Sequence, residues 1–146
     1  MEDVFQKLIL MIRAYYPVLY LHSYEYYRTK QKIKGIVELL RREGKKVNYY
    51  QWDCVYGLVQ ILPDKTEKRI ERMQNPLEVL AYILNSKKSG EKNIFVLDDI
   101  NNHIDRDEVK LMFRKIAEAT NNNTHAIILS SIYRLPAELE KYITVL

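Results

Sequence analysis

The sequence predicts a single α/β domain over residues 1–146, with a three-layer, doubly wound and mainly parallel sheet of about five strands. Short apolar runs alternate with amphipathic helical patterns along the whole chain. This order is typical of parallel strands joined by helical crossovers. The runs are apolar at nearly every position rather than at every second one, which indicates strands that are covered on both faces.

Five segments show helical spacing or helical start signals. Apolar residues from Phe5 to Tyr16 recur at i, i+3, i+4 and i+7, and Pro17 ends the pattern. Further helices are expected to begin near Ser23, Asn75, Asp107 and Pro136, the last running to Tyr142. Ser23 and Asn75 are expected to cap their helices, because both side chains can accept a hydrogen bond from the first turn.

The apolar runs predict five strands, at 18–21, 47–52, 93–97, 126–129 and 143–146. The segment 58–73 has a weaker pattern, in which two strand-like runs flank Pro63 and Asp64. It is interpreted as a small hairpin, with an irregular loop as the alternative.

Composition limits the chemistry. The single cysteine, Cys54, has no partner for an internal disulfide and is expected to be a buried small residue. His22, His103 and His125 lie far apart and form no metal-binding motif, so no metal site is expected. No apolar run approaches the roughly 18 residues of a membrane span. We therefore expect a cytoplasmic protein that does not enter membranes.

Ligands of doubly wound folds bind beyond the carboxyl ends of the strands. Polar residues follow four of the predicted strands, and we take Ser23, Asp98, Asp99 and Ser130 as candidate ligand-binding residues. Residues 94–99, Ile-Phe-Val-Leu-Asp-Asp, resemble the Walker B strand of AAA-type ATPases. Asp99, however, stands where those enzymes usually carry glutamate.

The phosphate-binding loop of such an enzyme is missing. Residues 21–27, Leu-His-Ser-Tyr-Glu-Tyr-Tyr, follow the first strand and contain neither glycine nor a Lys-Ser or Lys-Thr pair. A phosphate cradle needs glycines so that consecutive backbone N–H groups can surround the phosphates, and a lysine that contacts them. The fold is therefore expected to have P-loop-NTPase-like topology without a Walker A motif, with no cofactor and no catalytic residue.

A basic segment and several tyrosine pairs allow other interpretations. The net charge is +4, and its densest basic stretch contains Arg28, Lys32, Arg41, Arg42, Lys45 and Lys46. A solvated helix face is the simplest explanation, and nucleic-acid binding is the alternative. The paired tyrosines at 15–16, 26–27 and 49–50 are each expected to bury one ring and expose the other.

Several segments in order resemble one known family. They include Arg13-Ala14-Tyr15-Tyr16-Pro17, the run 75–80 (Asn-Pro-Leu-Glu-Val-Leu) and the run 135–140 (Leu-Pro-Ala-Glu-Leu-Glu). Together they are similar to the N-terminal region of the uncharacterised plastid- and bacterial-type AAA ATPases, in which a degenerate, P-loop-free domain precedes a genuine ATPase domain. The resemblance implies an accessory domain, either an N-terminal fragment of a longer ATPase or a free-standing relative.

Three functions follow from these observations. The first is a non-catalytic accessory or regulatory domain that contacts a protein partner or the ATPase ring of its own longer chain. The second is a nucleotide-sensing domain that binds without hydrolysis at the strand ends. The third, less favoured, is a nucleic-acid-binding module that uses the basic segment 28–46.

Overall fold

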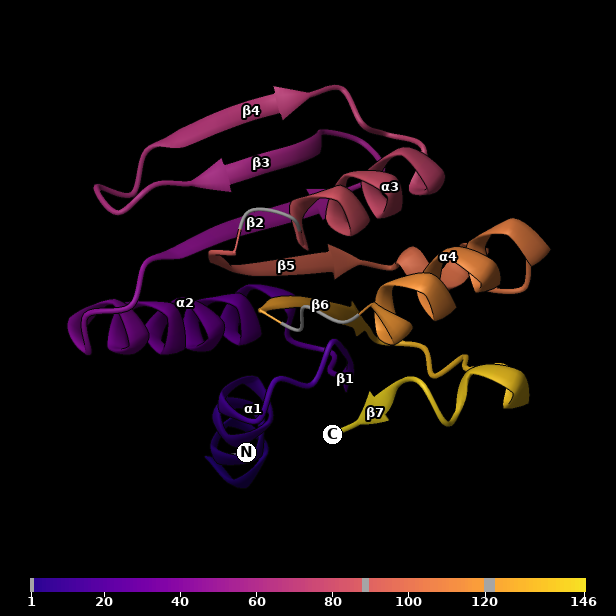
Figure 1. Ribbon diagram of the computed structural model, residues 1–146, viewed down its shortest axis with the longest axis horizontal. Coiled ribbons are helices and arrows are strands. Elements are labelled where there is room, and N and C mark those ends of the chain that lie inside the picture. The colour runs from indigo at the N-terminus through magenta and orange to yellow at the C-terminus, as the bar shows by residue number, and fades with distance from the viewer. Residues whose placement is uncertain (1, 88–89, 120–122) are drawn as a thin grey trace.

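The computed structural model describes residues 2–87, 90–119 and 123–146. Within them, a seven-stranded sheet runs through the molecule with helices on both faces (Figure 1). Its strands are β1 (Val18–His22), β2 (Val47–Asp53), β3 (Gly57–Ile61), β4 (Glu67–Glu71), β5 (Lys92–Asp98), β6 (Thr124–Ser130) and β7 (Thr144–Val145).

The strands lie in the order β4-β3-β2-β5-β6-β1-β7. Neighbours from β2 to β7 pair in parallel, whereas β2–β3 and β3–β4 are antiparallel. Five parallel strands thus form the P-loop-NTPase-like α/β fold that was predicted. The hairpin expected near 58–73 is also confirmed, and it extends the same sheet beyond β2.

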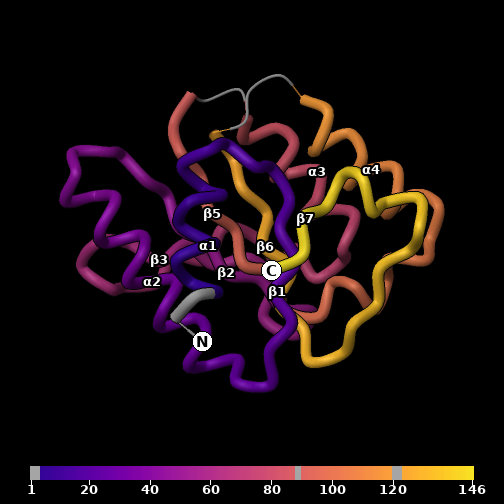
Figure 2. The backbone as a smooth tube through the Cα atoms, turned by 90° about the horizontal axis from the view of Figure 1, so that it is seen from below, coloured from indigo at the N-terminus to yellow at the C-terminus, as the bar shows by residue number. Residues whose placement is uncertain are grey.

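Four α-helices in the described residues cover the sheet: α1 (Glu2–Arg13), α2 (Tyr26–Arg42), α3 (Pro76–Ser86) and α4 (Asp107–Glu118). Two short 3₁₀ turns, η2 (Ile100–His103) and η3 (Ala137–Leu139), follow β5 and β6. The helices α1 and α2 lie on one face, and α3 and α4 lie on the other (Figure 1). Figure 2 shows β7 beside β1, with the C-terminus at this end of the sheet.

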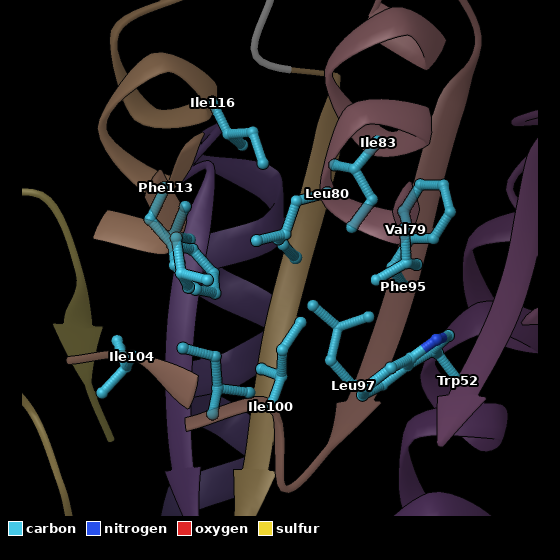
Figure 3. Close-up of a cluster of buried hydrophobic side chains, with 14 of the residues drawn as sticks. Trp52, Val79, Leu80, Ile83, Phe95, Leu97, Ile100, Ile104, Phe113 and Ile116 are labelled. Atoms are coloured by element: carbon cyan, nitrogen blue, oxygen red, sulfur yellow. The ribbon is translucent and has the colours of Figure 1, made fainter. Parts of the chain in front are cut away.

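The core consists of two apolar clusters, one on each face of the sheet. Figure 3 shows part of one, where Leu80 of α3 and Phe113 of α4 cover the same face of the sheet that carries Phe95 and Leu97 of β5. Every residue of β6 is buried, as expected for a central parallel strand. No helix among the described residues is long and apolar enough to cross a membrane.

Some local predictions were wrong. The helix expected at 136–142 is a single 3₁₀ turn. Ser23 does not cap α2, because the helix begins at Tyr26 and the cap position is Glu25, which makes no side-chain capping bond. Asn75, by contrast, accepts a hydrogen bond from the Leu77 N–H and caps α3 as predicted.

Burial also differs from the pattern in places. Cys54 is exposed because it lies in the turn between β2 and β3. Tyr49 and Tyr50 are both buried, since β2 is covered on both faces. Tyr15 and Tyr16 are both exposed in the turn that joins α1 to β1. Neighbouring side chains separate into core and surface only where one face of an element meets water.

A buried polar cluster closes the amino edge of the parallel strands. The Lys92 Nζ of β5 lies 2.8 Å from Nε2 of His125 in β6, and Nδ1 of His125 lies 2.6 Å from the Tyr16 carbonyl oxygen. This geometry fits a neutral imidazole that donates to Tyr16 and accepts from the lysine. Burial is the main reason why the pKa of His125 falls to about 3.

Candidate functional site

The carboxyl edge of the parallel strands brings the candidate residues Asp98 and Asp99 together with α2. Asp98 is the last residue of β5, and it is in phase with Ile94 and Val96, which pack on the α2 face. Its carboxylate forms an ion pair with the ammonium of Lys30, one turn into α2. The helix that follows the first strand therefore supplies the cation that compensates Asp98.

Asp98 is nevertheless in an unfavourable place for a carboxylate. Its Oδ1 is buried and has no hydrogen-bond partner among the described residues. Burial raises the pKa of Asp98, and the Lys30 ammonium partly offsets this effect. Asp53 and Asp99 raise the pKa of Asp98 further through charge repulsion. Lys30 is thus an essential part of the local charge balance.

Asp99 leaves the strand with a left-handed backbone, at φ 59°. Its Oδ1 accepts a hydrogen bond from the Tyr26 hydroxyl at 2.5 Å. The same hydroxyl accepts the Ser131 backbone N–H at 2.8 Å. Strand alternation predicts that Asp98 and Asp99 point to opposite faces. Both instead reach α2, because the left-handed turn places Asp99 outside the strand.

The other two candidates do not join this site. Ser130 is buried and in phase with Ala126 and Ile128, which pack on the face opposite Asp98. Its Oγ accepts the Ile132 N–H at 3.1 Å. The Ser23 Oγ lies 2.9 Å from the Thr29 hydroxyl and accepts the Glu25 N–H at 3.1 Å. Both serines shape their own loops.

Tyr26 and Lys30 are the residues that the candidate set missed. They lie four residues apart at the start of α2, so they occupy one face of the helix. The Tyr26 side chain occupies the region between the ends of β5 and β6, where its hydroxyl contacts Asp99 and Ser131. The i, i+4 spacing after the first strand was the available signal, but nothing in sequence linked it to residues 98 and 99.

A second polar network anchors the loop after β6. The Tyr20 hydroxyl donates to the Ile132 carbonyl at 2.8 Å and accepts from the Arg134 N–H at 3.0 Å. The buried Asn101 amide donates to both the Tyr20 hydroxyl and the Ile132 carbonyl, each at 2.9 Å. The loop backbone is held inward by these bonds, and the side chains of Ile132 and Tyr133 remain exposed.

Exposed large apolar side chains gather at this edge, in its loops and in the first turn of α2. They follow β1, β2 and β6, and we call them the edge patch: Tyr24, Tyr27, Val55, Tyr56, Ile132 and Tyr133. Tyr24 and Tyr27 are each 78% exposed, although both rings are large. The His22 ring lies 5.4 Å from the Tyr24 ring and 6.5 Å from the Tyr133 ring, so side chains from two loops meet.

Three of the six residues in the predicted basic patch have a polar partner. Arg41 donates to the Val47 carbonyl at 2.8 Å and is partly buried. Lys46 pairs with Glu91 at 3.1 Å, and Arg28 lies 3.7 Å from Glu25. Lys32, Arg42 and Lys45 are exposed. Because acidic residues and backbone carbonyls take up half of the predicted patch, its arrangement weakens the nucleic-acid interpretation.

The arrangement does not provide a phosphate cradle. The segment between β1 and α2 contains no glycine, and Tyr26 lies where consecutive free N–H groups would be needed. Lys30, the first of three lysines in this helix, is paired with Asp98. Among the described residues, no group of three or more His, Cys, Asp or Glu side chains is placed to hold a metal ion.

Comparison with known proteins identifies the family of the chain. The model of the SpoVK-like AAA ATPase N-terminal domain matches residues 4–146. The chain belongs to this family. It is also 27% identical over 139 residues to "Uncharacterized AAA domain-containing protein ycf46" of Guillardia theta. The matched segment covers 94% of this chain and 26% of that protein. The protein of the same name from Trieres chinensis is 26% identical over 141 residues, or 96% of this chain and 27% of that protein.

The chain thus spans about a quarter of the length of these relatives. The family model describes the N-terminal domain of an AAA ATPase. The chain is therefore an accessory domain of an AAA protein. The domain combines a P-loop-NTPase-like fold with strand ends that its own helix α2 fills.

Proposed function

We propose that this SpoVK-like N-terminal domain is non-catalytic and serves an AAA-type ATPase by making protein–protein contacts through its carboxyl edge. The observation that carries the proposal is the edge patch. Its side chains are large, apolar and exposed, and they lie in the segments that follow β1, β2 and β6 at one edge of the sheet. Such exposure costs free energy in water and is typical of surfaces that bind other proteins.

The absence of catalysis is supported by the contacts of α2. Hydrolysis of a nucleotide needs a phosphate cradle and a cation held by the acidic strand end. In this domain, Tyr26 occupies the position after β1, and Lys30 neutralises Asp98. The same edge that holds nucleotide in related folds is therefore free to serve as a contact surface.

Site-specific photocross-linking tests the contact. A photoreactive phenylalanine analogue replaces Tyr24 or Tyr133 in the protein expressed in its own cells, and cross-linked peptides are identified by mass spectrometry. Both positions should yield peptides of an AAA-type ATPase subunit. Leu111 on α4 is the matched control, because it is an exposed large apolar residue outside the patch. Equal yields from position 111, or no ATPase peptide from positions 24 and 133, would contradict the proposal.

Isothermal titration with ATP and ADP in the presence of magnesium tests the alternative of nucleotide sensing. We expect no binding at millimolar nucleotide. Micromolar binding that Asp98→Ala abolishes would replace the accessory proposal with a nucleotide sensor. Because Asp98 lies at the carboxyl end of β5 beside Lys30, this variant tests the region that nucleotide would have to use.

A further inference from the structure

An acidic cavity of about 480 Å³ opens at the ends of β2 and β5. It is lined by Tyr26, Trp52, Asp53, Cys54, Val55, Tyr56, Asp98, Asp99, Asn102 and His103. Three of these residues are aspartates and none is lysine or arginine. This is unusual in a chain whose net charge is +4. The lining of the cavity is therefore acidic although the chain as a whole is basic.

Two of the three carboxylates have no cationic partner among the described residues. Lys30 pairs with Asp98 alone. Asp53 uses Oδ1 to accept the backbone N–H groups of Val55 and Tyr56, at 2.8 and 2.7 Å. Asp99 uses Oδ1 to accept from Tyr26. In the described part of the chain, the Oδ2 atoms of Asp53 and Asp99 accept no hydrogen bond, so each can receive an incoming donor.

The carboxylates also repel one another. Asp53 and Asp99 both raise the pKa of Asp98 through their charge. A cation bound between Asp53 and Asp99 removes part of this repulsion, so its binding is favoured beyond the individual contacts. The described residues of the cavity do not form a metal-binding group. The complementary ligand is consequently an organic cation.

The walls indicate what carries that cation. Tyr26, Trp52 and Tyr56 line the cavity; Trp52 is buried in the core, whereas Tyr56 is 64% exposed and can meet a ligand. Aromatic walls bind the aliphatic stem of a basic side chain, and they attract its charge through the ring face. A guanidinium group presents several donors in one plane, so it can reach two separate carboxylates while stacking on a ring.

We propose that this cavity binds an arginine side chain of a protein partner, with Asp53 and Asp99 as acceptors and Tyr56 as the stacking wall. The inference rests on the proposed contact function and adds the chemistry of the partner. It places the anchoring residue of the interface beside the apolar edge patch, as in interfaces where a buried arginine is surrounded by apolar contacts.

The experiment is an NMR titration of the ¹⁵N-labelled protein with the peptide acetyl-Gly-Gly-Arg-Gly-Gly-amide. We expect saturable shifts of the amide signals of Asp53, Tyr56 and Asp99. The same peptide with citrulline, which keeps the shape and loses the charge, should cause no saturable shift. Asp53→Asn and Asp99→Asn should each raise the Kd about threefold or more. Both substitutions keep the Oδ1 acceptor, and asparagine tolerates the left-handed backbone at position 99.

Asp64→Asn is the matched control. Asp64 also accepts a backbone N–H through Oδ1 in a turn, from Thr66 at 3.0 Å, but it lies in the β3–β4 turn. Asp64→Asn should leave the Kd of the arginine peptide unchanged, although it changes the net charge of the protein by the same amount as Asp53→Asn or Asp99→Asn. Equal weakening by Asp64→Asn, or equal binding of the citrulline peptide, would overturn the proposal. The proposal would also be overturned if Mg²⁺ shifted the same amide signals at a lower concentration than the arginine peptide does.

The outcome is separable from that of the cross-linking experiment. Cross-links from positions 24 and 133 report contact at the edge patch whether or not arginine enters the cavity. If those cross-links form and the arginine peptide does not bind, the contact function stands and the arginine inference fails. If the peptide binds and no ATPase peptide is cross-linked, the cavity chemistry stands and the ATPase contact fails.

Discussion

Lys30 of α2 forms an ion pair with Asp98, the last residue of β5, at the position where the fold would otherwise expose an acidic strand end to ligand. The side chains are only 21% and 14% exposed. Water therefore screens the pair weakly, and loss of one partner leaves the other charge poorly solvated.

Lys30→Met should lower the free energy of unfolding by about 1–3 kcal/mol at pH 7, because the Asp98 carboxylate loses its cation. Urea denaturation measures this change. The pKa of Asp98 is already raised in the folded state, and the substitution raises it further. The folded variant then takes up a proton more readily than the unfolded chain. The deficit relative to wild type should consequently shrink as the pH falls toward 4.

The double variant Lys30→Met with Asp98→Asn is the control for this prediction. It removes both charges, so it should recover a large part of the lost stability. A double variant that is as unstable as Lys30→Met alone would show that the unpaired charge of Asp98 does not explain the loss of stability.

Tyr26→Phe should lower the free energy of unfolding by about 1–2 kcal/mol, because the Asp99 carboxylate and the Ser131 N–H both lose the same hydroxyl. Tyr27→Phe is the matched control, since Tyr27 is its neighbour in sequence and its ring is 78% exposed. Thermal or urea unfolding compares the two variants. Equal losses would argue against a structural role of the Tyr26 hydroxyl.

His125→Gln should be destabilising by about 1–2 kcal/mol at pH 7, because the imidazole bridges Lys92 and the Tyr16 carbonyl. The pKa of His125 in the folded protein is about 3, below the ordinary value of 6.5. Protons therefore bind the unfolded chain first. The free energy of unfolding of the wild type therefore falls as the pH decreases from 6.5 toward 3, by up to about 1.4 kcal/mol per pH unit.

The difference between wild type and His125→Gln should thus narrow below pH 6.5 and change sign near about pH 5, because the variant lacks this titration. Urea unfolding of both proteins between pH 7 and pH 4 measures it. A difference that stays constant over this range would mean that His125 titrates normally in the folded protein.

Glycine substitutions should have opposite effects at two positions. Gly35 lies within α2, and a Cβ there would meet nothing within 4 Å. Gly35→Ala should therefore raise the free energy of unfolding by about 0.5–1 kcal/mol. Gly57 has φ +80°, and a Cβ would lie 3.1 Å from the Met73 nitrogen. Gly57→Ala should lower stability by at least about 1 kcal/mol.

Gly44→Ala separates the two causes at Gly57. Gly44 also has a positive φ, +88°, but a Cβ there would have open space. It should cost less than Gly57→Ala in the same unfolding experiment. Equal costs would show that backbone strain alone, without the contact to Met73, explains the loss.

The sequence by itself determined the order of elements and the covering of both sheet faces. These features depend on local periodicity, as in the fully apolar runs 94–97 and 126–129, which lie within β5 and β6. The missing phosphate loop was visible for the same reason, because a cradle needs glycines at adjacent positions and residues 21–27 have none. The hairpin at 58–73 was only partly visible, since the charged outer strand β4 carries almost no apolar pattern.

Only the tertiary structure decided how the strand ends are used. Ser130 and Asp98 end neighbouring strands, yet they lie on opposite faces of the sheet because their phases differ. Lys30 looked like one member of a basic helix, and it became the partner of a carboxylate 68 residues away. The pairing of Lys30 with Asp98 and the clustering of Asp53, Asp98 and Asp99 depend on strand register and on the position of α2. These are set by packing across the whole sheet, which no local pattern encodes.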